Sequence, residues 1–169
     1  SQNDSSITSY FRADKITGLN NGDAVSSWTD WKASIAVSQG TASYKPTYVT
    51  NAVNSKPVVR FDGVNDYLSA STFVPATGAN ARTLVHVFIN KDTTTSSNNG
   101  VSFWGADSNL QDYGLYASGN SSGNFGSSNI TGYVHGYSRP YSTPKETVSN
   151  ITPSNATRLV IQTYNGSTD

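Results

Sequence analysis

The sequence predicts an all-β fold, and three observations lead to this prediction. Short runs of β-branched and aromatic residues recur along the chain. Stretches of Ser, Thr, Asn and Gly separate these runs, and such residues favour turns and loops. No segment has the apolar period of a long amphipathic helix. Many short strands separated by turns are typical of a β-sandwich or a β-barrel.

The expected strands follow from these runs in chain order. They are residues 7–11, 44–49, 57–61, 83–89, 101–104, 114–117, 132–135 and 158–164. Within residues 83–89, both alternating sets of side chains are largely apolar, so we expect a central strand. A short helical turn is expected within residues 26–34, because Trp28, Trp31 and Ile35 share a helical spacing. The polar segments expected to form long surface loops are residues 92–99 and 118–129.

The segment KPVVRFDGVNDYL, residues 56–68, is the most informative part of the chain. Pro57 and the β-branched and aromatic residues after it predict a strand. Asp62-Gly63 and Asn65-Asp66 then supply the residues of a tight turn. The segment therefore predicts a strand, a polar turn and the beginning of another apolar run.

Together with YFRAD at residues 10–14 and DAVSSWTD at residues 23–30, this segment resembles the laminin-G-like domains of the concanavalin A-like lectin/glucanase superfamily, of bacterial or phage type. The likeness is good over residues 7–70 and rests on pattern alone beyond them. It implies a two-sheet antiparallel jelly-roll sandwich that forms a single domain over residues 7–169. Residues 1–6 are expected to be a flexible tail.

The C-terminal region predicts an open sheet edge. Residues 158–164 form a strong strand pattern and turn residues follow it, whereas the resembled family continues with a further strand. We therefore expect the sandwich to lack its last strand or strands in this chain. Either the remainder has been removed, or a strand from another protein chain completes the sheet. The expected strand-pairing edge consists of Leu159, Ile161 and Tyr164.

The composition limits the classes of partner. The formal net charge is zero and 13% of residues are charged, which argues against binding to nucleic acid. The chain has neither Cys nor Met, as expected for a processed extracellular, cell-surface or virion protein that does without disulfides. No apolar run approaches the roughly 20 residues of a membrane span. A glycan or another cell-surface ligand is the expected partner.

Enzymatic activity is disfavoured, because the usual catalytic residues are missing from the sequence. Glycoside hydrolysis usually needs a pair of carboxylates, and Glu146 is the single glutamate of the chain. The hydrolases of the resembled superfamily carry closely spaced Glu and Asp on a strand, and its lyases carry a Gln-x-His motif. Neither pattern occurs here. Both activities remain open alternatives to a non-catalytic domain.

Carbohydrate recognition requires exposed aromatic faces and planar polar groups. The candidate residues for this role are Trp31, Trp104, Tyr113, Tyr137 and Tyr141. The alternative for each of them is packing on a half-buried face of a sheet. Trp28 and Phe61 lie in the segments that resemble the family and are expected in the core.

Calcium is the metal that the sequence favours, although no cofactor is required. Hard cations bind clusters of carboxylate and carbonyl oxygens, and the candidate ligands are Asp62, Asn65 and Asp66. The alternative is that these side chains only cap the tight turn through Asx-type hydrogen bonds. Spacing alone does not distinguish the two roles.

Two functions follow from these observations. The first is a non-catalytic extracellular adhesion or carbohydrate-binding module, part of a larger surface, secreted or virion protein. The second is a structural subunit of an extracellular filament, surface layer or virion, in which a strand from another chain completes the open edge. The fold alone does not decide between them.

Overall fold

The structure is a computed structural model. It describes residues 4–70, 81–89 and 157–164, together with the backbone of the strands β6 to β9 defined below. Contacts divide the chain into two compact units, Ser1–Pro75 and Ala76–Asp169. Each unit is described by itself. The single-domain prediction for residues 7–169 stays a prediction.

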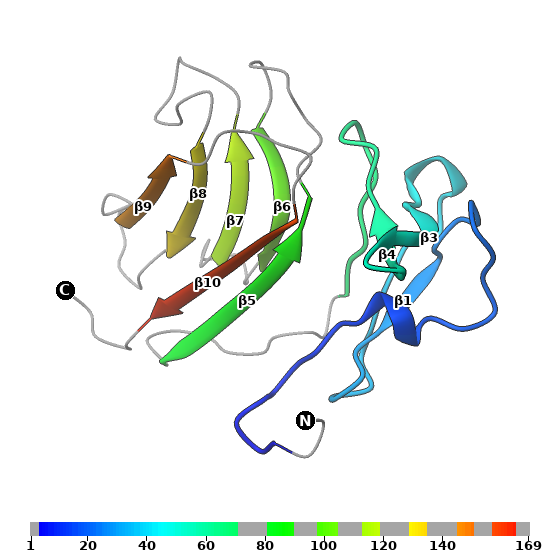
Figure 1. Cartoon of the computed structure of the whole chain (residues 1–169), viewed down its shortest axis with the longest axis horizontal. Coiled ribbons are helices and arrows are strands. Elements are labelled where there is room, and N and C mark those ends of the chain that lie inside the picture. Colours follow the sequence, from blue (N-terminus) through cyan, green and yellow to red (C-terminus); the bar gives the residue numbers. More distant parts are fainter. Residues whose placement is uncertain are drawn as a thin grey trace. The chain divides into compact units, whose positions relative to one another are not determined.

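The first unit consists of two antiparallel strand pairs and two short 3₁₀ helices (Figure 1). Its elements are η1 (Ala13–Lys15), β1 (Ser27–Thr29), β2 (Ala36–Ser38), η2 (Ala42–Tyr44), β3 (Thr47–Val53) and β4 (Lys56–Arg60). Strand β1 pairs with β2, and β3 pairs with β4.

The β3–β4 hairpin follows from its turn residues. Asn54 and Ser55 both have positive φ, 46° and 60°, which is the backbone conformation of a two-residue type I′ turn. The pairing shifts between Val49 and Val53, where Asn51 has a φ of 52°. The shift in strand pairing therefore occurs at Asn51, and asparagine tolerates the left-handed backbone region.

The core of the first unit lies where β3 meets the segment before β1. Val25 and Tyr48 have 0% and 7% of their surface exposed, and Pro46 is also fully buried. The backbone N–H of Val25 donates to Pro46 O at 2.7 Å, and that of Tyr48 donates to Asp23 O at 2.8 Å. Phe61 is 43% exposed, so the prediction that it lies in the core is wrong. It follows the last residue of β4, where the Asp62 turn already begins.

The strand expected at residues 7–11 does not form, and the helical turn expected after it is confined to one turn. Residues 7–11 are not a strand, because Tyr10 bonds through its N–H to the Asp30 carboxylate and through its carbonyl to the Trp31 N–H. The short helical turn expected within residues 26–34 is limited to a single turn after β1, in which the Ser34 N–H donates to Asp30 O at 3.0 Å. The Asp30 carboxylate accepts further hydrogen bonds from the backbone N–H groups of this turn.

The second unit contains the antiparallel pair of β5 (Arg82–Phe88) and β10 (Arg158–Tyr164), shown side by side in Figure 1. Leu84 is buried on one face of this pair. Val85, Val87, Leu159 and Ile161 share the other face, and each is at least 60% exposed. The expectation of a central strand is therefore wrong for the described strands, because β5 pairs with β10 alone. One apolar face of the pair is exposed.

A four-stranded antiparallel sheet completes the second unit. Its strands, in spatial order, are β6 (Asn98–Trp104), β7 (Tyr113–Ser118), β8 (Asn129–Val134) and β9 (Lys145–Asn150). These strands include the ends of both expected loops, and the remainder of those loops lies outside the described residues. The all-β prediction is confirmed, because the described elements are antiparallel strands with two 3₁₀ helices. Among the described residues there is no helix long and apolar enough to cross a membrane.

Candidate functional site

Asp30 fixes the N-terminal segment to the turn after β1. Only 1% of Asp30 is exposed. Its Oδ1 accepts hydrogen bonds from the backbone N–H groups of Lys32 and Ala33, both at 2.6 Å. Its Oδ2 accepts one from the Tyr10 N–H at 2.8 Å and another from Ser9 Oγ. Burial raises the pKa of this carboxyl, but the hydrogen bonds from Ser9, Ala33, Lys32 and Tyr10 outweigh it, so the pKa is lowered.

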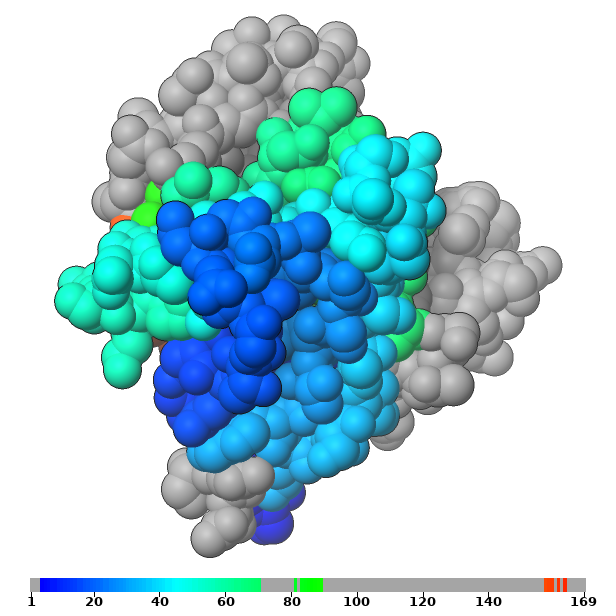
Figure 2. Space-filling view, turned by 90° about the vertical axis from the view of Figure 1, so that its right-hand side faces the viewer, coloured from blue at the N-terminus to red at the C-terminus, as the bar shows by residue number. Residues whose placement is uncertain are grey.

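This anchor brings Tyr10 beside Trp31. The backbone N–H of Trp31 donates to Tyr10 O at 2.9 Å. The Tyr10 backbone is therefore held through its carbonyl by Trp31 and through its N–H by the Asp30 carboxylate. The two rings meet edge to face, with centroids 6.2 Å apart and an angle of 62° between their planes. Figure 2 shows the N-terminal segment, in dark blue, on the surface of the first unit.

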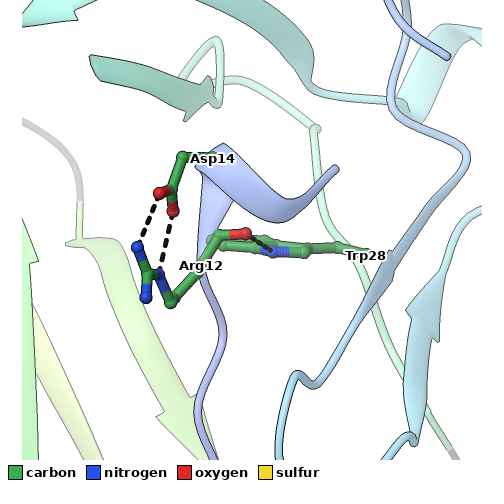
Figure 3. Close-up of polar contacts among 3 residues, drawn as sticks. All are labelled: Arg12, Asp14 and Trp28. Carbon is green, nitrogen blue, oxygen red and sulfur yellow. Dashed lines mark hydrogen bonds and ion pairs between the residues drawn. The ribbon is translucent and has the colours of Figure 1, made fainter. Parts of the chain in front are cut away.

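Arg12 is held in place by Asp14 and by the packing of Trp28 (Figure 3). Arg12 Nε and Nη2 donate to the two carboxylate oxygens of Asp14 at 2.9 and 2.6 Å. This paired contact raises the pKa of Arg12 and lowers that of Asp14. Trp28 Nε1 donates to Arg12 O at 3.1 Å, and the Trp28 ring packs edge to face against Phe11. The Arg12 backbone and guanidinium are therefore both fixed.

These contacts assemble a group that we call the cation–aromatic cluster, formed by Tyr10, Arg12, Lys15 and Trp31. Arg12 Cζ lies 5.6 Å from the Tyr10 ring centroid and 4.9 Å from that of Trp31. Lys15 Nζ also lies 4.9 Å from the Trp31 centroid. These distances are within the range of cation–π attraction. Tyr10 is 42% exposed and Lys15 is exposed, so the cluster offers an aromatic ring and cationic donors to solvent.

Of the predicted carbohydrate-binding residues, the structure places Trp31 in this cluster. Trp104 and Tyr113 are register partners on β6 and β7, and their side chains lie outside the described residues. Tyr137 and Tyr141 lie outside the described residues entirely. Their roles stay predictions.

Sequence reasoning did not name Tyr10, Arg12 or Lys15 as binding residues. The signal was the segment YFRADK, in which Tyr10 and Arg12 are two residues apart. In an extended backbone that spacing places two side chains on one face.

The predicted calcium ligands form the turn after β4. Asp62 Oδ1 accepts backbone hydrogen bonds from Val64, Asn65 and Asp66 at 2.8 to 3.2 Å, and Asp66 Oδ2 accepts one from the Asp62 N–H at 2.9 Å. The backbone hydrogen bonds from Val64 and Asn65 lower the pKa of Asp62, whereas burial and the charge of Asp62 raise the pKa of Asp66. In the described part of the chain, no three His, Cys, Asp or Glu residues form a metal-binding group. The Asp62 carboxylate thus caps the turn, and calcium binding stays a prediction.

The predicted pairing edge lies on β10. Leu159 and Ile161 are opposite Val87 and Val85 of β5, and Tyr164 is opposite Arg82. Among the described strands, β10 has β5 as its one neighbour. Its second edge therefore has no strand partner in that part of the chain.

No family model matches this chain, and neither a curated protein nor a solved structure matches it. The likeness to laminin-G-like domains rests on the sequence segments quoted above.

Proposed function

We propose that this chain is an extracellular, non-catalytic carbohydrate-binding or adhesion module with a laminin-G-like, two-sheet jelly-roll fold. The observation that carries the function is the cation–aromatic cluster. Sugar rings bind to exposed aromatic faces, and their hydroxyl groups accept hydrogen bonds from charged donors. The cluster supplies both kinds of group on a surface that the Asp30 contacts hold in place.

Tyr10 is the residue on which this proposal depends most. It is the most exposed ring of the cluster, and its backbone is held by Asp30 and Trp31. Because the backbone contacts do not involve the phenol ring, Tyr10→Ala removes the ring and leaves the anchor in place. Tyr44, which is 38% exposed and packs near Tyr67, offers a matched control.

The test is a glycan array followed by calorimetric titration of each bound oligosaccharide. We expect the chain to bind a defined set of glycans. Tyr10→Ala should weaken binding by about tenfold or more, which corresponds to roughly 1.4 kcal/mol or more, and Tyr44→Ala should retain it. Absence of binding to every glycan, or equal loss in both variants, contradicts the proposal.

The alternative, a structural subunit completed by a strand from another chain, is favoured by a different observation. Val85, Val87, Leu159 and Ile161 form an exposed aliphatic face on the β5–β10 pair. Exposed apolar faces and open strand edges favour association. Light scattering distinguishes the two functions: ordered assemblies that Ile161→Lys dissolves favour the structural subunit, whereas a monomer at all concentrations favours the binding module.

Calcium at the Asp62–Asp66 turn is part of the proposal. Burial and, to a smaller extent, the charge of Asp62 raise the pKa of Asp66, and a divalent cation bound between the two carboxylates relieves their repulsion. We expect calcium to raise the melting temperature of the wild-type chain and to have a smaller effect on Asp66→Asn. An equal response of the two proteins, or no response, contradicts calcium binding at this turn.

A further inference from the structure

One hydrogen-bonding edge of the Arg12 guanidinium has no acceptor among the residues that the structure describes. Asp14 takes the edge formed by Nε and Nη2. An arginine has five N–H donors, so those on Nη1 and one on Nη2 remain. No described residue accepts a hydrogen bond from Nη1, and 30% of the Arg12 side chain is exposed. The remaining edge has the forked geometry that binds a carboxylate through two parallel hydrogen bonds.

Lys15 places a second cation at the same cluster. Its ammonium lies 4.9 Å from the Trp31 centroid and forms no ion pair with a described residue. Because the lysine stem is flexible, the ammonium can move toward an anion bound at Arg12. The nearby carboxylates are already engaged: Asp14 is paired with Arg12, and Asp30 is buried among four donors. The accessible charge of the cluster is therefore positive.

We propose that the cation–aromatic cluster binds a carboxylate-bearing sugar, namely a uronic acid unit of an acidic polysaccharide. This inference rests on the proposed carbohydrate-binding function and specifies its ligand class. The sugar carboxylate bonds to the outer edge of Arg12 and to Lys15, while the sugar ring packs on Tyr10. One anionic group matches the two cations, whereas a polyphosphate chain would need a longer basic surface than a chain of zero net charge provides.

Lys15→Gln is the variant that tests the inference with the least risk to folding. Lys15 is exposed, and its ammonium lies over the Trp31 ring and within electrostatic reach of Asp14, without a hydrogen bond or ion pair to a described residue. Lys56→Gln, at an exposed position at the beginning of β4, is the matched control. Thermal unfolding of both variants should match that of the wild type. This confirms that any change in binding is local.

The experiment is calorimetric titration with a glucuronic acid oligosaccharide and with its carboxyl-reduced, neutral counterpart. We expect the wild type to bind the acidic probe at least about tenfold more tightly than the neutral one, because a charge-assisted hydrogen bond contributes on that scale. Lys15→Gln should lose most of this preference, and Lys56→Gln should keep it. Added salt should weaken binding of the acidic probe alone.

Two results overturn the inference in distinguishable ways. If both probes bind equally and Lys15→Gln has no effect, the acidic ligand class is wrong, and carbohydrate binding itself is retained. If neither probe binds and the glycan array is also negative, the proposed function fails together with the inference.

Discussion

Replacing Asp30 with alanine is expected to destabilise the first unit by about 3 to 5 kcal/mol, because three backbone N–H groups and the Ser9 hydroxyl lose their acceptor. Urea unfolding followed by tryptophan fluorescence measures this change. Asp30→Asn keeps one side-chain oxygen and should cost less. Asp62→Asn, at an exposed turn where asparagine keeps an Oδ1 that accepts the same backbone hydrogen bonds, serves as the control for Asp30→Asn.

The same contacts give Asp30 a defined effect on the pH dependence of stability. Its folded-state pKa lies below the unfolded value. Its contribution is therefore fully present above the unfolded pKa of about 3.9 and is lost as the pH falls through the lower, folded pKa. Asp30→Asn should flatten this acid-induced loss. If Asp30→Asn has the stability of the wild type and loses it at the same low pH, Asp30 does not anchor the N-terminal segment.

Replacing Trp28 with alanine is expected to cost about 3 kcal/mol, because a large half-buried ring and its hydrogen bond are lost together. The ring packs on Phe11 with centroids 5.6 Å apart, and its Nε1 bonds to Arg12 O at 3.1 Å. Trp28→Phe retains an aromatic ring and should cost about 1 kcal/mol, close to the value of one hydrogen bond.

Val64→Ala provides the comparison for Trp28, since Val64 is 84% exposed and its truncation should change stability by less than about 0.5 kcal/mol. Both changes are measured by denaturant unfolding monitored by circular dichroism. If Trp28→Ala is as mild as Val64→Ala, the packing between Phe11, Trp28 and Arg12 does not hold the N-terminal segment.

The strands that could be predicted best are those whose side chains alternate over many residues. Residues 158–164 match β10 at both ends, and β5 begins one residue before the expected start and also ends one before the expected end. β1, β2 and β9 were missed. β1 and β2 are three residues each, and β9 contains Lys, Glu, Ser and Asn, which are weak strand signals.

The error at residues 7–11 of the first unit has a physical origin in the Asp30 carboxylate. The sequence around Tyr10 predicts a strand, but the carboxylate takes the Tyr10 backbone N–H and also binds the turn after β1. A side chain that competes for backbone donors in this way overrides local propensity.

Only part of the candidate site could be predicted from the sequence, because contacts between distant segments assemble it. Trp31 could be named because an aromatic residue in a polar segment is a plausible sugar platform. Tyr10, Arg12 and Lys15 join it through contacts between segments about 20 positions apart, and residue type does not reveal such contacts. The sequence also did not predict that the aliphatic face of β5 and β10 is exposed. The alternation of side chains shows which face is apolar, but it does not show whether another element covers that face.

The most direct test of the central claim, that the cation–aromatic cluster binds carbohydrate, is an NMR titration of the ¹⁵N-labelled chain with the oligosaccharide that binds most tightly on the glycan array. The account predicts shifts that saturate at the backbone amides of residues 10–15 and at the Trp31 indole N–H. Saturable shifts confined to other residues, or no shifts at any ligand concentration, would contradict it.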